Sequence, residues 1–395
     1  MKAGQKERGT VVDASSRRRE AAGLSLNFSH GGDREAFAAA TGREPLDFSV
    51  NLNPLGIPEA VVSAYCEAAS EVRYPDPCCR ELTAALAEHY GLPAENILCG
   101  NGASDIIYRY FRAISPAQVL IPVPTFSEYP QAVAAGGGQC VFFPLREEEG
   151  FRLTEGILDV LSGKIDCLVL INPHNPTGRL IEESLFWEIL KTARDRNIRV
   201  FVDACFMELT GTPFPYSEII EEYPNVFILN AFTKTYAMAG MRLGFGMTAD
   251  TDLVEKMRKA GPPWSVSWPA QKAGITALAE EAYLLEAVAM ISAERERLME
   301  ALTSLGFAVI PSDANFIMFF SDRELVQPLA KEGIMIRDLN RETGLRKTGQ
   351  TDSPEHETGG RTGAAGRAKY RYRIAVRNPE ENGILLGALQ KIVRE

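Results

Sequence analysis

The stretch 233–242 has the side-chain types and spacing to hold a small cofactor. Lys234 follows Thr233, and a short loop containing Gly240 separates the lysine from Arg242. A lysine amine can condense with an aldehyde, and a guanidinium binds phosphate through paired hydrogen bonds. A cofactor with an aldehyde at one end and a phosphate at the other suits this pair. A lone lysine is more often a solvated surface charge, so the interpretation depends on residues elsewhere.

Two upstream segments supply the remaining chemistry. The turn Asn-Pro-His-Asn-Pro-Thr-Gly follows an apolar run, and its Asn175 can donate its side-chain amide to a phenolic oxygen. A second apolar run ends in Asp203, whose burial is costly unless it meets a cation such as a pyridinium nitrogen. Either segment alone would be an ordinary strand-end turn. Together they predict pyridoxal 5'-phosphate as cofactor, with Lys234 and Asp203 as catalytic residues.

Two further strand ends carry candidate cofactor contacts. The segment Gly-Asn-Gly-Ala-Ser-Asp at 100–105 begins a helical pattern, where glycine and free N–H groups allow an anion to approach. Ser and Asp are also ordinary helix caps, and both interpretations can hold. Phe126 ends another strand pattern, and its flat ring suits either stacking on a pyridine or the core.

Apolar runs alternate with helical patterns from about residue 80 to 280. This alternation predicts an α/β domain with a mostly parallel sheet, in which ligands bind at the carboxyl ends of the strands. A helical pattern from Pro269 to Leu305 leads out of this domain. The expected strands are Asn96–Cys99, Val119–Val123, Cys140–Phe143, Cys167–Ile171, Val200–Asp203, Val226–Leu229 and Leu243–Met247.

Later strand patterns at Ala308–Ile310, Phe316–Phe320 and Tyr372–Val376 predict a smaller C-terminal α/β domain. The expected organisation is a disordered extension over 1–27, an arm over 28–60 that packs on the small domain, a large cofactor-binding domain over 61–285, and a small domain over 286–395. Residues 341–369 contain few apolar side chains and are expected to form a mobile insertion within the small domain.

Composition excludes several classes of protein. The 395 residues, 45% of them hydrophobic, can bury a large core. A net charge of −10 argues against nonspecific nucleic-acid binding, and no run reaches the ~18 apolar residues of a membrane span. The charged N-terminus lacks the apolar segment of a secretory signal. Seven cysteines without a CxxC pair and four scattered histidines indicate buried thiols in a reducing cytoplasm and predict no metal site.

With these motifs in this order, the chain from about residue 30 onward resembles the fold-type I aminotransferases and their relatives. The resemblance implies a fold-type I transferase architecture, a large domain with a mostly parallel sheet plus a smaller α/β domain. It also implies a homodimer, because the segment Arg-Tyr-Pro-Asp-Pro around Tyr74 is similar to one that reaches the partner's cofactor phosphate. The implied cofactor contacts are Gly102, Ala103, Ser104, Phe126, Asn175, Asp203, Thr233, Lys234, Arg242 and Tyr74.

Two branches of this family compete, histidinol-phosphate aminotransferase and threonine-phosphate decarboxylase of cobalamin biosynthesis. The segments His-Gly-Gly at 30–32, Asp-Phe-Ser-x-Asn from Asp47 and Pro-Trp-Ser-Val from Pro263 are closer to the decarboxylase. Guanidinium forks suit carboxylate and phosphate, although a surface salt bridge is the commoner role of arginine. The implied substrate contacts are His30, Gly31, Asn53, Asn175, Arg337 and Arg373.

The resemblance implies decarboxylation of L-threonine O-3-phosphate to (R)-1-amino-2-propanol O-phosphate and CO2, for the nucleotide loop of cobalamin. The alternatives are a serine-phosphate decarboxylase, a histidinol-phosphate aminotransferase, or a catalytically idle relative. Two departures from the family pattern keep the last one open. Ala204 and Cys205 follow Asp203 where the family has Glu-Ala, and Ala231 replaces the hydroxyl expected three residues before Lys234.

Overall fold

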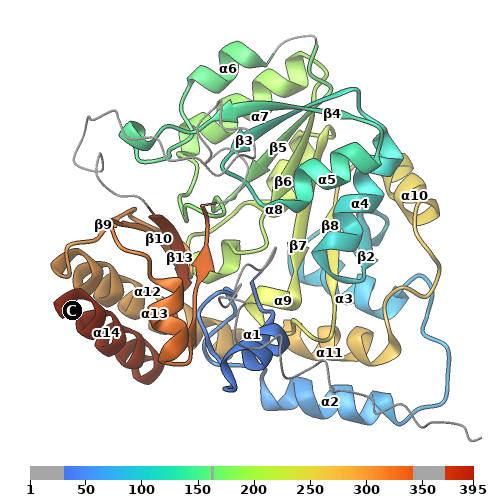
Figure 1. Cartoon of the computed structure of the whole chain (residues 1–395). Helices are drawn as coiled ribbons and strands as arrows, with labels where there is room; N and C mark the ends of the chain where they lie inside the picture. Colours follow the sequence, from blue (N-terminus) through green and yellow to red (C-terminus); the bar gives the residue numbers. More distant parts are fainter. Residues whose placement is uncertain (1–30, 162–163, 341–369) are drawn as a thin grey trace, which may run out of the picture.

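A seven-stranded sheet dominates the structure, a computed structural model that describes residues 31–161, 164–340 and 370–395 (Figure 1). The strand order is β2-β8-β7-β6-β5-β3-β4, in which β4, β3, β5, β6 and β7 run parallel. Strand β8 is antiparallel to both β7 and β2. The predicted α/β class with a mostly parallel sheet is confirmed. The strands are β2 Ile97–Gly100, β3 Gln118–Val123, β4 Gln139–Pro144, β5 Cys167–Ile171, β6 Arg199–Asp203, β7 Val226–Ala231 and β8 Gly244–Met247.

Helices cover both faces of this sheet, because the central strands are apolar on both sides. All five residues of β5 are buried; Leu168 and Leu170 face one hydrophobic cluster, and Cys167 and Val169 face another. The first cluster takes residues from α2, α3, α7, α8 and α11, and the second from α4, α5 and α10. The helices are α2 Glu59–Ala69, α3 Arg80–Tyr90, α4 Gly102–Ile114, α5 Glu128–Ala135, α6 Gly156–Val160, α7 Glu183–Asp195, α8 Tyr216–Glu222, α9 Phe232–Thr235, α10 Thr251–Lys259 and α11 Trp268–Leu278, with 3-10 turns η1 Ala94–Asn96, η2 Glu147–Glu149 and η3 Met207–Thr210.

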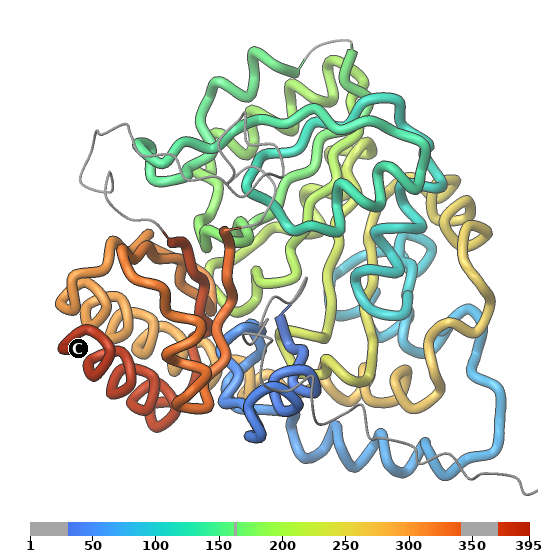
Figure 2. Tube along the Cα trace, in the orientation of Figure 1, coloured from blue at the N-terminus to red at the C-terminus, as the bar shows by residue number. Residues whose placement is uncertain are grey.

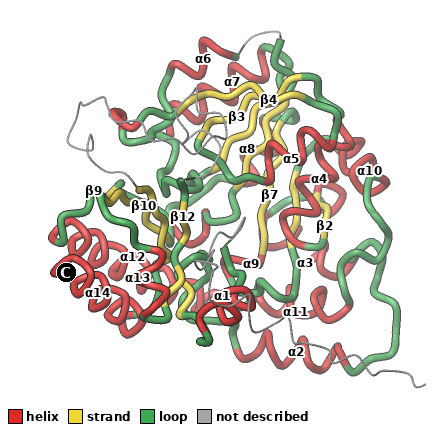
Figure 3. The backbone as a smooth tube through the Cα atoms, in the orientation of Figure 1, coloured by secondary structure: helices red, strands yellow, loops and turns green. Residues whose placement is uncertain are grey.

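A smaller antiparallel sheet, in the order β12-β13-β10-β9, packs against helices in the C-terminal part of the chain (Figure 3). Its core cluster combines apolar residues from strands β10 and β13 with others from helices α12 and α14. These elements are α12 Glu281–Ser304, β9 Ala308–Val309, β10 Phe316–Ser321, α13 Val326–Lys331, β11 Ile334–Met335, β12 Arg337–Asp338, β13 Tyr370–Ala375 and α14 Pro379–Arg394.

The first described residues lie against this smaller sheet, as the blue segment of Figure 2 shows. Strand β1, Leu46–Asp47, pairs in parallel with β11, and Phe48 is part of the small sheet's core. Helix α1, Arg34–Thr41, contributes Phe37 to a cluster with Ala330 and Met335. The boundaries of the arm and of the two domains stay predictions.

One predicted element is wrong. The helical pattern from Pro269 to Leu305 forms two helices, α11 and α12, with Ala279 and Glu280 between them. Helix α11 packs on α2 and α3, whereas α12 packs on η3 of the large body and on α14 and β9 of the small one, so α12 connects the two bodies. The predicted strands are all found, with ends that differ by at most two residues.

The expected disordered extension, the insertion at 341–369 and His30 lie outside the described residues. Within the described part of the chain, no helix is long and apolar enough to cross a membrane.

Close packing between β7 and β8 generates a test of the fold. A Cβ at Gly246 would overlap the ring of Phe227, which stacks on Phe201 inside the core. We therefore expect Gly246→Ala to lower the free energy of unfolding by about 1–3 kcal/mol, through overpacking. Gly387→Ala, on the exposed face of α14 with nothing within 4 Å, is the matched control and should raise it by about 0.5–1 kcal/mol. Equal urea midpoints for both variants would contradict this packing.

Candidate active site

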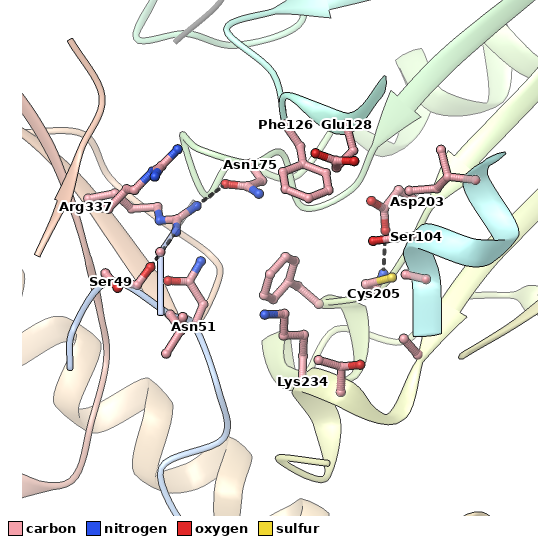
Figure 4. Close-up of a pocket in the computed structure, with 18 of the residues that line it drawn as sticks. Ser49, Asn51, Ser104, Phe126, Glu128, Asn175, Asp203, Cys205, Lys234 and Arg337 are labelled. Atoms are coloured by element: carbon pink, nitrogen blue, oxygen red, sulfur yellow. Dashed lines mark hydrogen bonds between the residues drawn. The ribbon is translucent and has the colours of Figure 1, made fainter. Parts of the chain in front are cut away.

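A cavity of about 450 Å³ lies where the carboxyl ends of β5, β6 and β7 approach the small sheet (Figure 4). This volume is typical of a small-molecule site, and the position is the one that parallel α/β sheets use for ligands. Segments far apart in the sequence therefore meet at one place. The predicted site residues that line the cavity are Gly31, Ala103, Ser104, Phe126, Asn175, Asp203, Thr233, Lys234, Arg242, Arg337 and Arg373.

Asp203 ends strand β6 and is only 8% exposed. The hydroxyl of Tyr129 donates to its Oδ2 at 2.6 Å, and the Cys205 amide donates to its Oδ1 at 3.0 Å. Hydrogen bonds of this kind stabilise an ionised carboxylate and offset the cost of its burial. Burial, followed by the charge of Asp203, raises the pKa of Tyr129 well above its usual value, so this tyrosine stays a donor. The arrangement suits a carboxylate that faces a protonated ring nitrogen.

Lys234 lies in the short helix α9, directly after β7, and its side chain reaches into the cavity (Figure 4). Desolvation, followed by the charge of Arg373, lowers the pKa of Lys234 to about 8. Roughly a tenth of such amines are neutral at pH 7, against well under a thousandth for an ordinary lysine. Only the neutral amine attacks an aldehyde, so the site prepares Lys234 for that reaction.

Arg242 and the start of α4 form a cradle for an anion at one end of the cavity. The guanidinium lies so close to Gly102 that a Cβ there would come within 2.5 Å of Nη2. A Cβ at Gly244 would lie 2.7 Å from the carbonyl carbon of Gly102, so this close approach also requires glycine. A helix N-terminus beside a guanidinium is a favourable position for a phosphate.

Arg337 and Arg373 form a second cationic region on the side of the small sheet. The two residues are direct partners in the antiparallel pair β12–β13. The Arg373 guanidinium donates from Nη1 to Asn175 Oδ1 at 2.5 Å and from Nη2 to the Ser49 carbonyl at 2.9 Å. Like charges directly opposite one another across two strands are destabilising, and an anion between them removes that cost.

Three predicted contacts, Gly102, Asn53 and Tyr74, are not among the residues that line the cavity of this chain. Asn53 is buried beneath the lysine loop, where its Nδ2 donates to the Thr235 carbonyl at 2.8 Å and its Oδ1 accepts from the Leu55 amide at 3.0 Å. Because both polar groups are used, Asn53 supports the loop and does not face substrate, which corrects that prediction. Tyr74 is 79% exposed and lies outside the cavity, beside Trp264 at 5.5 Å between ring centroids.

The structure adds residues that the sequence interpretation did not assign to the site. Ser49 and Asn51 stand near Arg337 in Figure 4, and their segment had been singled out only as a resemblance. Glu128 follows Phe126 in the same turn and accepts from the Tyr108 hydroxyl at 3.2 Å. The added lining residues are Ser49, Val50, Asn51, Ile107, Glu128, Cys205, Phe206 and Ala231.

These groups fit pyridoxal phosphate. Asp203 suits the ring nitrogen, Lys234 the aldehyde and Arg242 the phosphate, and the three line one cavity. Phe126 lies on the same side as Asp203 and offers a ring for stacking (Figure 4).

Comparisons with known proteins agree with this fit. The family model described as aminotransferase class I and II matches residues 43–350. The threonine-phosphate decarboxylase of Salmonella typhimurium is 33% identical over 376 residues, which cover 93% of this chain and 97% of that protein. The structure of the histidinol-phosphate aminotransferase from Clostridium acetobutylicum has a TM-score of 0.76 at 29% identity, and the match covers 88% of this chain and 98% of that one.

A further structure, of the histidinol-phosphate aminotransferase from Sinorhizobium meliloti in complex with pyridoxal-5'-phosphate, has a TM-score of 0.76 at 24% identity. The match covers 93% of this chain and 96% of that one, and it supports the fold. The chain therefore belongs to the class I and II aminotransferase family. It has the fold-type I architecture of that family, and pyridoxal phosphate is its cofactor.

Proposed function

We propose that this enzyme decarboxylates an amino acid O-phosphate, L-threonine O-3-phosphate, to (R)-1-amino-2-propanol O-phosphate and CO2. The observation that carries the proposal is the pair Arg337 and Arg373, two guanidiniums that are direct strand partners and line the cavity of Lys234. The substrate brings a carboxylate and a phosphate of about two negative charges, which two arginines can hold together. The 33% identity to a threonine-phosphate decarboxylase, over 93% of this chain, supports the same substrate class.

Each residue then has a task in the reaction. When bound, pyridoxal phosphate supplies an electron sink for the bond that breaks. Asp203 keeps the positive charge of the ring nitrogen in place. Arg337 and Arg373 hold the substrate's two anionic groups and so decide which bond at the α-carbon stands perpendicular to the ring. With a pKa of about 8, Lys234 is mainly the ammonium form at neutral pH, and this form returns a proton to the α-carbon and becomes the neutral amine.

The product suits the synthesis of the cobalamin nucleotide loop, which is the pathway we propose. We also propose the cytoplasm as its location. All seven cysteines, Cys66, Cys78, Cys79, Cys99, Cys140, Cys167 and Cys205, are unpaired thiols, as is common in a reducing compartment. A histidinol-phosphate aminotransferase is the second candidate, favoured by the 29% identity and the fold of the Clostridium acetobutylicum enzyme.

The substrate test compares phosphorylated and plain amino acids. We expect CO2 release from threonine phosphate with no 2-oxo acid present. Plain threonine should react slower by a factor of ~10⁴ in kcat/KM, because the arginines would be left without their anion. Serine phosphate is the third substrate. Because it lacks the methyl group of threonine phosphate, the ratio of the two kcat/KM values measures the preference for that group. Equal turnover of threonine and threonine phosphate would refute the two-arginine site, and a strict need for 2-oxoglutarate would favour the aminotransferase.

The lowered pKa of Lys234 generates a pH prediction for the apo-protein. Attachment of pyridoxal phosphate requires the neutral amine, so its rate should rise with pH and level off above about 8, where an ordinary lysine would level off only near 10.4. Stopped-flow absorbance of the lysine-linked cofactor measures this rate. Arg373→Met removes the positive charge that is the second cause of the lowered Lys234 pKa. The attachment rate of this variant should therefore level off at a higher pH. Lys234→Ala is the blank. A wild-type plateau near pH 10 would contradict the assignment.

We further propose a homodimer in which Tyr74 contacts the cofactor phosphate of the partner subunit. Exposed apolar side chains gather near this residue, with Val72 fully exposed and Trp264 50% exposed, as expected of an interface. Tyr74→Phe should weaken cofactor binding by roughly 10–100-fold, the usual value of a hydrogen bond to a charged group. Sedimentation should find the dimer unchanged.

A hybrid dimer distinguishes action across the interface from action within one subunit. We expect a mixture of Tyr74→Phe and Lys234→Ala protomers to regain activity, because one of the two shared sites in each hybrid then holds both native residues. If Tyr74 acts within its own subunit, every site of the hybrid is defective and no activity returns. Recovery that requires subunit exchange, followed over time after mixing, supports the shared site.

A further inference from the structure

Behind the lysine loop, on the side away from the active-site cavity, a carboxylate is held by neutral groups. Glu208, in η3, accepts on Oε1 from the Tyr216 hydroxyl at 2.8 Å, the Tyr90 hydroxyl at 3.1 Å and the Asn230 side-chain amide at 2.5 Å. These donors come from α8, α3 and β7, so three separate elements converge on one oxygen. None of the three donors carries a positive charge.

The second oxygen of this carboxylate has no hydrogen-bond partner. Glu208 Oε2 is buried and finds no donor among the described residues. No arginine, lysine or histidine of the described ranges forms an ion pair with Glu208, and its negative charge contributes, after burial, to raising the pKa of both Tyr90 and Tyr216. Glu208 as a whole is only half-buried, but its Oε2 is withdrawn from water, and a carboxylate oxygen in that position is costly without a donor or a cation.

A small cavity adjoins this carboxylate. It is lined by Glu208, Tyr90, Asn230 and Thr235, and its volume of about 20 Å³ has room for one occupant of the size of a water molecule. Thr235 is 3% exposed, and its Oγ1 also lacks a partner among the residues that the structure describes. Two unsatisfied oxygens, on Glu208 and Thr235, therefore belong to residues that line the same small space.

We propose that this cavity binds one monovalent alkali cation, K⁺ or Na⁺. Carboxylate and hydroxyl oxygens, here Glu208 Oε2 and Thr235 Oγ1, are ligands that hard cations prefer. One carboxylate balances one positive charge, which favours a monovalent cation. The described residues contain no group of three or more His, Cys, Asp or Glu side chains of the kind that holds a divalent or transition metal. A water molecule would satisfy hydrogen bonds but leave the charge of Glu208 unbalanced. His89 also lines the cavity, but it is exposed and stacks edge-on against Tyr90.

The cation would act on the chain segment that carries the catalytic lysine. Thr235 follows Lys234, and Ala231 lines both this cavity and the active-site cavity. Binding there ties η3, β7 and the end of α9 together and so restrains Lys234. This inference does not rest on the substrate assigned above, because the site and its test are independent of the reaction.

The test measures thermal unfolding of the cofactor-loaded enzyme in chloride salts of K⁺, Na⁺ and tetramethylammonium at equal ionic strength and pH 8.5. Tetramethylammonium is too large for the cavity and controls for ionic strength. We expect a saturable rise in Tm of about 2 °C or more in K⁺ or Na⁺ alone. Glu222→Gln, a surface carboxylate paired with Arg194, should keep the rise. Glu208→Gln, which keeps the shape and removes the charge, should lose it.

Two measurements keep the proposal falsifiable if Glu208→Gln fails to fold. Thr235→Val removes one ligand oxygen and should raise the half-saturating cation concentration. Crystals of the wild-type enzyme soaked in Tl⁺, an anomalous scatterer that replaces K⁺, should show a peak beside Glu208 Oε2. Equal Tm in all three salts, a cation-specific rise that persists in Glu208→Gln, or no Tl⁺ peak at saturation would overturn the site and assign the cavity to water.

Discussion

A buried carboxylate at the end of a central strand is the constraint on which the active site depends. Tyr129 and the Cys205 amide donate to the two oxygens of Asp203 and so offset the cost of burying its charge there. Tyr129 comes from α5, which follows β3, a strand separated from β6 by β5, and it packs within the aromatic core beside Phe201. Core packing therefore fixes the position of the Tyr129 hydroxyl. The carboxylate of Asp203 is held in turn where it can face a cationic ring nitrogen.

The rest of the cavity is arranged around positive charge. Arg242 lies beside the start of α4, and Arg337 and Arg373 face each other across two strands of the small sheet. Lys234 lines the same cavity, where desolvation, followed by the charges of Arg373 and Arg242, lowers its pKa to about 8. Repulsion between these cations destabilises the arrangement. Bound anions relieve this repulsion, so the site favours anionic ligands. One arrangement thus both binds phosphate groups and keeps the lysine reactive.

Most strands of the fold could be predicted from the sequence, because their apolar runs are short and end in turn residues. Cys167–Ile171 has the predicted bounds, and Asp203 lies at the predicted strand end. The helical pattern from Pro269 to Leu305 was misread as one element, since a periodic sequence does not show where a helix leaves one packing partner for another. Helix α11 packs on α2 and α3, and α12 packs on η3, α14 and β9, so the two helices have different packing partners.

The sequence by itself determined the chemical types of the site. Lys234, Asp203 and Asn175 lie at or just after strand ends, where parallel sheets bind ligands, and arginines supply the positive charge. The sequence did not determine which side chains face the cavity. Asn53 belongs to a motif that resembles a substrate segment, yet its amide is used by the Thr235 carbonyl, while Asn51 in the same motif lines the cavity. Glu208 and Thr235 likewise carry no local signal. Only tertiary packing decides such cases, because hydrogen-bond partners and burial come from residues distant in sequence.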